Sequence, residues 1–92
     1  MNNVDYNKMG LRIRNQRKEK GLSQEQLAEL IGISLSFLGH IERGTRKASV
    51  ETLARICKAL NADMHYIVFG CSSGYSVNSE LLCELRELVQ RY

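Results

Sequence analysis

The chain has 92 residues, of which 43% are hydrophobic and 25% charged. This is enough for one small domain with a core, and we expect no second, ligand-sensing domain. No apolar run approaches the roughly 18 residues of a membrane span, and the polar N-terminus lacks a signal-peptide core, so we expect a cytoplasmic protein without membrane contact. Three separated cysteines and two histidines show no zinc-ligand spacing. We therefore expect no metal, no cofactor and no enzymatic activity.

The positive charge is concentrated in the first half of the chain. Residues 1–47 carry nine Lys or Arg against five acids, a net charge of +4, whereas residues 48–92 carry four against five, a net charge of −1. A basic half joined to a slightly acidic half is typical of a protein with one surface that meets phosphates. Ordinary solvated helix surface is the other interpretation, and charge alone does not choose between them.

Helix start and stop signals predict five helices in residues 1–70 and no strands. In chain order the predicted helices cover about residues 7–20, 24–31, 35–43, 50–60 and 64–69. Apolar residues within them recur at the three-and-four spacing of a buried helix face. The predicted inward-facing residues are Met9, Ile13, Leu27, Ala28, Ile31, Leu38, Ile41, Val50, Leu53, Ile56, Cys57 and Leu60.

The most informative stretch lies between Ser23 and Gly44. Ser23 and Gln26 have the spacing of a capping box, in which each side chain bonds the backbone N–H of the other residue. The tight turn over residues 32–34 then joins two short helices, because its glycine frees the backbone and Ser34 caps the next helix. Such a pair meets at a steep angle, so the second helix projects one side as major-groove readers do.

The same stretch resembles a known family. The segments at residues 21–28 (GLSQEQLA), 32–34 (GIS), 41–44 (IERG) and 49–53 (SVETL) stand in the order found in the Cro/lambda-repressor-like, or XRE, family of helix-turn-helix regulators. The resemblance covers about residues 9–70. It implies an all-α fold, with a five-helix lambda-repressor-like DNA-binding domain in residues 1–70 and a C-terminal amphipathic helix outside it.

The resemblance also implies which residues contact DNA. Gln24 matches a phosphate-contacting glutamine, and Arg17 with Glu42 matches a partly buried ion pair. The remaining positions point into the groove, flank those that do, or form a basic loop that clamps the DNA backbone: Ser34, Leu35, Ser36, Gly39, His40, Arg43, Thr45, Arg46 and Lys47. Leu35 departs from the family, because its side chain can pack on a thymine methyl but cannot donate a hydrogen bond.

Residues 71–78 read as a linker and residues 79–92 as an amphipathic helix. The helix has one apolar stripe, formed by Leu81, Leu82, Leu85, Leu88, Val89 and Tyr92. Two interpretations stay open: the stripe pairs with a second copy, or it folds back over Leu11 or Leu30. We take it as a dimerisation element.

These observations predict a sequence-specific transcription regulator that docks residues 35–43 in the major groove of double-stranded DNA. We expect a homodimer on a pseudo-palindromic operator, acting as a repressor. The alternative is a protein–protein adaptor, or an antitoxin-like protein, that binds a partner through the C-terminal helix. Prophage repressors, antitoxins and restriction–modification controllers all occur among small members of the family.

Overall fold

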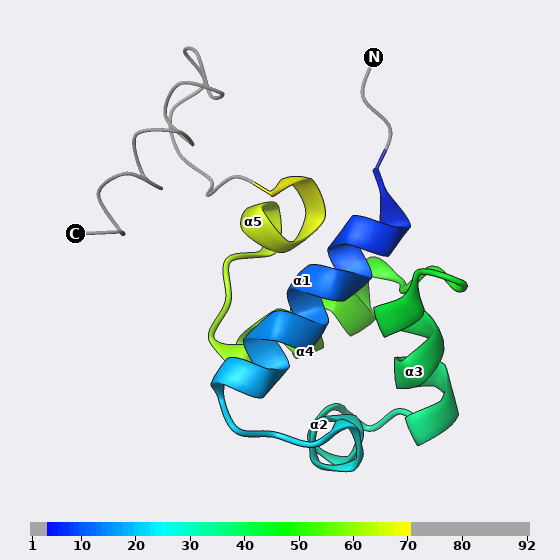
Figure 1. Ribbon diagram of the computed structural model, residues 1–92. Coiled ribbons are helices and arrows are strands. Elements are labelled where there is room, and N and C mark those ends of the chain that lie inside the picture. Colours follow the sequence, from blue (N-terminus) through cyan, green and yellow to red (C-terminus); the bar gives the residue numbers. More distant parts are fainter. Residues whose placement is uncertain (1–3, 71–92) are drawn as a thin grey trace, which may run out of the picture.

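The structure is a computed structural model that describes residues 4–70, and the helices in this part of the chain are drawn in Figure 1. They are α1 (Tyr6–Glu19), α2 (Gln24–Ile31), α3 (Leu35–Arg43), α4 (Val50–Leu60) and α5 (Met64–Phe69). No strand occurs within these residues. The predicted all-α fold and its five helices are therefore confirmed, with α1 shifted by one residue toward the N-terminus. The predicted linker 71–78 and C-terminal helix 79–92 lie outside the described residues.

A capping side chain precedes each helix and explains where it starts. The capping oxygen accepts a hydrogen bond from a backbone N–H two or three residues further on, and the caps are Asp5, Ser23, Ser34, Ser49 and Asp63. At α2 the predicted box is complete. The N–H of Gln26 donates to Ser23 Oγ at 3.0 Å, and the N–H of Ser23 donates to Gln26 Oε1 at 2.8 Å. A good N-cap contributes about 1 kcal/mol to helix stability.

Left-handed residues end the two helices of the central motif, as the glycines at these places predict. Gly32 stops α2 with φ +75°, and Gly44 stops α3 with φ +78°. Gly44 also lies directly against the start of α1, where a Cβ atom would collide with the backbone of Asn7. The end of α3 is therefore fixed both by its own backbone conformation and by contact with α1.

The helices surround a single apolar core. In Figure 1, α1 crosses in front of α4, α3 flanks them, α2 closes one end and α5 covers the other. α1 contacts α3, α4 and α5, and α2 contacts α3 and α4. The buried apolar side chains are Met9, Ile13, Leu27, Ala28, Ile31, Leu38, Ile41, Leu53, Ile56, Cys57, Leu60 and Ile67. This set contains every predicted inward-facing residue except Val50.

The prediction for Val50 was wrong. Val50 has the correct spacing from Leu53 for the buried face of α4, yet 76% of its surface is exposed. It is the first residue of the helix, directly after the cap Ser49, and the core begins one turn later, at Leu53. Helical periodicity gives the direction of a side chain but not the extent of the neighbouring helices.

Cys57 is a core residue, as its place in an apolar stripe predicted. Burial, and secondarily the negative charge of Asp63, raises the pKa of the Cys57 thiol. The side chain therefore stays a neutral thiol near neutral pH, which is the form that suits an apolar core.

Within residues 4–70, no helix is long and apolar enough to cross a bilayer.

Gly10 marks the closest approach of two helices. It is buried on α1, against the last turn of α3. A Cβ atom at this position would overlap the carbonyl oxygens of Ile41 and Glu42, which are backbone atoms and cannot turn aside. The missing side chain thus allows α1 and α3 to pack backbone against backbone, which holds α3 firmly on the body of the domain.

Candidate nucleic-acid interface

α3 has one packed side and one side turned to solvent. Leu38 and Ile41 are completely buried. Around the helix from them, Ser36 is exposed, Leu35 is 44% exposed and His40 is half-buried. The structure therefore brings the three predicted base-facing residues to the open side of a helix whose other side is anchored in the core.

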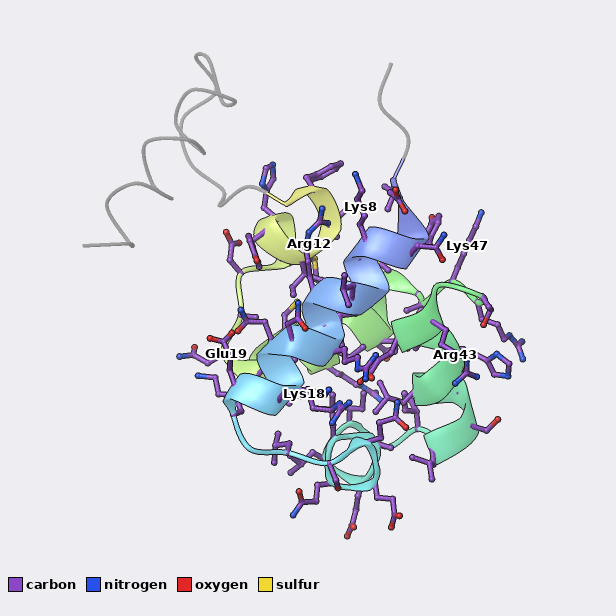
Figure 2. All side chains as sticks on the ribbon, in the orientation of Figure 1. Lys8, Arg12, Lys18, Glu19, Arg43 and Lys47 are labelled. Carbon is purple, nitrogen blue, oxygen red and sulfur yellow. The ribbon has the colours of Figure 1, made fainter. Side chains whose placement is uncertain are left out.

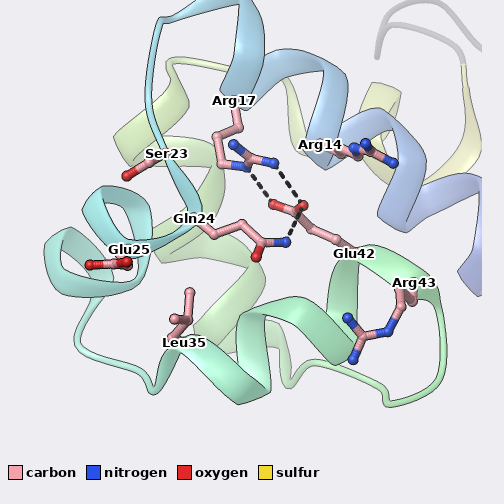
Figure 3. A pocket seen from close by; sticks show the side chains of 8 residues that line it. All are labelled: Arg14, Arg17, Ser23, Gln24, Glu25, Leu35, Glu42 and Arg43. Atoms are coloured by element: carbon pink, nitrogen blue, oxygen red, sulfur yellow. Dashed lines mark hydrogen bonds and ion pairs between the residues drawn. The ribbon is translucent and has the colours of Figure 1, made fainter.

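A buried hydrogen-bond network holds α3 in this position. The Glu42 carboxylate accepts from Arg17 Nε at 2.7 Å and from Arg17 Nη2 at 3.1 Å. Only 8% of the Arg17 side chain and 2% of the Glu42 side chain are exposed. Arg17 Nη1 also donates to the Leu22 carbonyl at 2.8 Å. The pair that the resemblance implied is present and links α1 to α3 (Figure 3). Through Leu22, Arg17 also links α1 to the turn between α1 and α2.

Gln24 joins the same network, which the sequence did not indicate. Gln24 Nε2 donates to Glu42 Oε1 at 3.0 Å, so three helices meet at one carboxylate. The expected partner of Gln24 was a DNA phosphate. A side-chain amide nitrogen carries two N–H groups, and Glu42 takes one of them. The other N–H is left to donate to a phosphate, and this contact stays a prediction.

A hollow of about 530 Å³ opens beside this network, between α1, α2 and α3 (Figure 3). The side chains that line it are Arg14, Arg17, Ser23, Gln24, Glu25, Leu35, Glu42 and Arg43. It brings together Gln24, Leu35 and Arg43 from the predicted DNA-contacting set. Arg14 was missed, because it lies on α1, outside the two-helix motif from which the contacts were drawn.

The basic loop after α3 is held by aromatic rings and by His40. The Arg46 guanidinium lies 5.6 Å from the centre of the Phe37 ring, and Lys47 Nζ lies 5.2 Å from that of Tyr6. A cation–π interaction of this kind contributes about 0.5–1 kcal/mol at an exposed site. The Thr45 hydroxyl bonds His40 Nδ1 at 2.8 Å. These contacts orient the predicted clamping residues without neutralising their charge.

The loop and α3 share one side of the molecule. Figure 2 shows Arg43 and Lys47 extending from that side, away from α5. Two further residues of the predicted set contribute to the structure of α3. Ser34 Oγ caps the helix and accepts a hydrogen bond from the Phe37 N–H at 3.0 Å. Gly39 is buried beneath the Arg43 side chain. The residues of the predicted dimerisation stripe lie outside the described part of the chain.

Comparisons with known proteins agree with this geometry. Residues 13–67 match the model of the helix-turn-helix family HTH_3. The ImmF control region 10 kDa protein of Bacillus phage phi105 is 38% identical over 64 residues, covering 70% of this chain and 71% of the phage protein. Some curated relatives are longer, and the chain spans 16% of the length of the HTH-type transcriptional regulator RamB of Mycobacterium tuberculosis.

Solved structures with a similar fold are likewise those of regulatory proteins. The restriction–modification controller protein C.AhdI from Aeromonas hydrophila superposes with a TM-score of 0.66 at 40% identity, covering 68% of this chain and 96% of that protein. The P22 c2 repressor, crystallised with a synthetic operator, superposes with a TM-score of 0.65 at 32% identity, covering 67% and 94%. The chain therefore belongs to the HTH_3 helix-turn-helix family, the XRE-type DNA-binding transcription regulators.

Proposed function

We propose that this regulator binds a specific operator by inserting α3 into the major groove of double-stranded DNA. The observation that carries the proposal is the open side of α3, where Leu35, Ser36 and His40 lie beside the cations of residues 43–47. Base edges are distinguishable in the major groove, which is wide enough for a helix. Leu35 suits a thymine methyl, and the polar Ser36 and His40 suit hydrogen-bonding base edges.

Phosphate contacts flank the reading helix in this proposal. Arg43, Arg46 and Lys47 are exposed, and none forms an ion pair with a carboxylate in residues 4–70. Their charge is therefore available to the DNA backbone. Arg46 and Lys47 start from restrained positions, because each lies over an aromatic ring. Less side-chain freedom is lost on binding when the groups are already oriented.

The phosphate contacts can be tested by the salt dependence of binding. We expect Arg46→Ala and Lys47→Ala each to flatten the slope of log affinity against log salt by about 1, on selected and on random duplexes alike. The matched control is Lys58→Ala, an exposed cation on α4 beside a separate hollow between α2 and α4, which should leave the slope unchanged. An unaltered slope for both loop variants would refute the clamping role.

We further propose that the protein represses as a homodimer in the cytoplasm. A single motif of this size reads few base pairs, so useful specificity requires two half-sites about one DNA turn apart. The apolar stripe from Leu81 to Tyr92 supplies large side chains, each worth roughly 1.5–3 kcal/mol on burial before association costs. The P22 c2 repressor, which shares the fold, supports repression as the outcome.

The dimer proposal is tested in the full chain with Leu85→Glu. A charge in the middle of an apolar interface is costly to bury, so we expect sedimentation to show a monomer that melts at the wild-type temperature. Operator affinity should fall strongly while binding to random DNA changes little. Glu84→Gln, one residue away on the polar side of the predicted helix, is the control. A Leu85→Glu protein that sediments as a dimer would place the interface elsewhere.

A further inference from the structure

The three arginines of α1 have different surroundings. Arg17 is buried in its ion pair with Glu42. Arg12 Nη1 donates to the carbonyl oxygens of Ile67 and Val68, at 3.0 and 3.3 Å, and so caps the end of α5. Arg14 is exposed and lines the hollow between α1, α2 and α3, without a hydrogen bond or ion pair to any residue in the described range.

The charged groups that line the hollow carry an excess of positive charge. Three guanidinium groups line it, from Arg14, Arg17 and Arg43, together with the carboxylates of Glu25 and Glu42. Arg17 and Gln24 already satisfy Glu42. Among the charged groups that line the hollow, Arg14, Arg43 and Glu25 form no ion pair within residues 4–70, which leaves two cations against one carboxylate. In Figure 3 these two arginines project on the same side of Glu42, one from α1 and one from α3.

We infer that this hollow binds a phosphodiester of the DNA backbone, and that Arg14 is a phosphate contact supplied by the first helix. The inference rests on the proposed docking of α3, because the hollow adjoins Leu35 at the start of that helix. A helix in the major groove is bordered by the phosphates of both strands. A phosphate in the hollow lies between the guanidinium groups of Arg14 and Arg43 and accepts from the second N–H of Gln24.

This arrangement gives Arg14 a role distinct from that of the loop cations. Arg46 and Lys47 follow α3 in the chain, whereas Arg14 contacts DNA from a helix fixed to α3 through Gly10 and the Arg17–Glu42 pair. The contact therefore restricts how deeply and at what tilt α3 enters the groove. Phosphate contacts of this kind set the orientation of a protein on DNA and carry no sequence preference themselves.

The test measures binding of Arg14→Ala and Arg14→Lys on selected and random duplexes at several salt concentrations. Arg14→Ala is expected to flatten the log–log salt slope by about 1 on both duplexes, and Arg14→Lys to restore it, with thermal melting unchanged in both. Lys58→Ala is again the control cation. Methylphosphonate substitution, one phosphate at a time, should identify a phosphate whose neutralisation weakens the wild type but not Arg14→Ala.

Two outcomes would overturn the inference. An Arg14→Ala protein with the wild-type salt slope would show that the side chain contacts no phosphate. If the affinity of Arg14→Ala fell as much as that of the wild type on every methylphosphonate duplex, the reduced salt slope of Arg14→Ala would arise without a specific phosphate in the hollow. If Arg46→Ala and Lys47→Ala still flatten the slope in either case, the proposed function stands and the inference about Arg14 alone fails.

Discussion

Replacing Glu42 by alanine is expected to lower the free energy of unfolding by roughly 3–5 kcal/mol, because it leaves the guanidinium of Arg17 buried without a counter-charge. The Glu42 carboxylate accepts three hydrogen bonds, two from Arg17 and one from Gln24. Arg17→Met should cost a similar amount, since it leaves the carboxylate buried with only the Gln24 amide. Thermal and denaturant unfolding of the two variants measures both losses.

The double variant and an exposed pair complete the experiment. Arg17→Met with Glu42→Ala should lose much less than the sum of the single losses, because neither charge remains alone in the interior. The control is Glu51→Ala, which breaks the Glu51–Arg55 pair of α4, whose side chains are 70% and 55% exposed. That loss should stay under about 1 kcal/mol. Small, additive losses for Arg17 and Glu42 would contradict the buried network.

A single added methyl group at Gly10 should be nearly as damaging. Gly10→Ala places a Cβ atom against the backbone carbonyls of Ile41 and Glu42, so α1 and α3 must separate. Overpacking of this kind costs about 3 kcal/mol where the surroundings cannot yield. Because the separation also displaces the open side of α3, operator affinity should fall further than the loss of folded protein explains. Unfolding and duplex titrations under the same conditions measure the two effects.

Gly39 provides the matched control for this substitution. It is also a buried helical glycine, but the atoms nearest a new Cβ belong to the exposed side chain of Arg43, the closest at 3.1 Å. That side chain can move, and alanine is favoured over glycine inside a helix by about 1 kcal/mol. Gly39→Ala should therefore leave stability unchanged or raise it. Equal losses at Gly10 and Gly39 would contradict the described packing of α1 on α3.

The features predicted correctly from the sequence are mainly local ones. Ser23 and Gln26 form their capping box within four residues, and Gly32 and Gly44 end their helices through their own backbone conformation. Such signals need no knowledge of the rest of the fold. The Arg17–Glu42 pair joins residues 25 apart in the sequence. It was predicted only because the family resemblance supplied the long-range contact.

The features that were missed depend on which helices lie next to each other. Gly10 was not among the residues that the sequence analysis selected, and the crossing of α1 and α3 explains why it has no side chain. Arg14 lines the hollow because α1 borders it. The Gln24–Glu42 bond and the stacking of Lys47 on Tyr6 likewise join separate elements. One signal was available: a glycine inside a helix lowers its stability and therefore often has a packing reason.

The most direct test of the central claim is selection of bound duplexes from a random pool with the full chain and with His40→Ala. The wild type should enrich an inverted repeat with half-sites about one turn apart. His40→Ala should keep the repeat but change the preference at one or two base pairs in each half by about 1–3 kcal/mol, with little change in non-specific affinity. A wild-type pool without an enriched sequence, or a His40→Ala protein weakened equally on every duplex, would contradict sequence reading by α3.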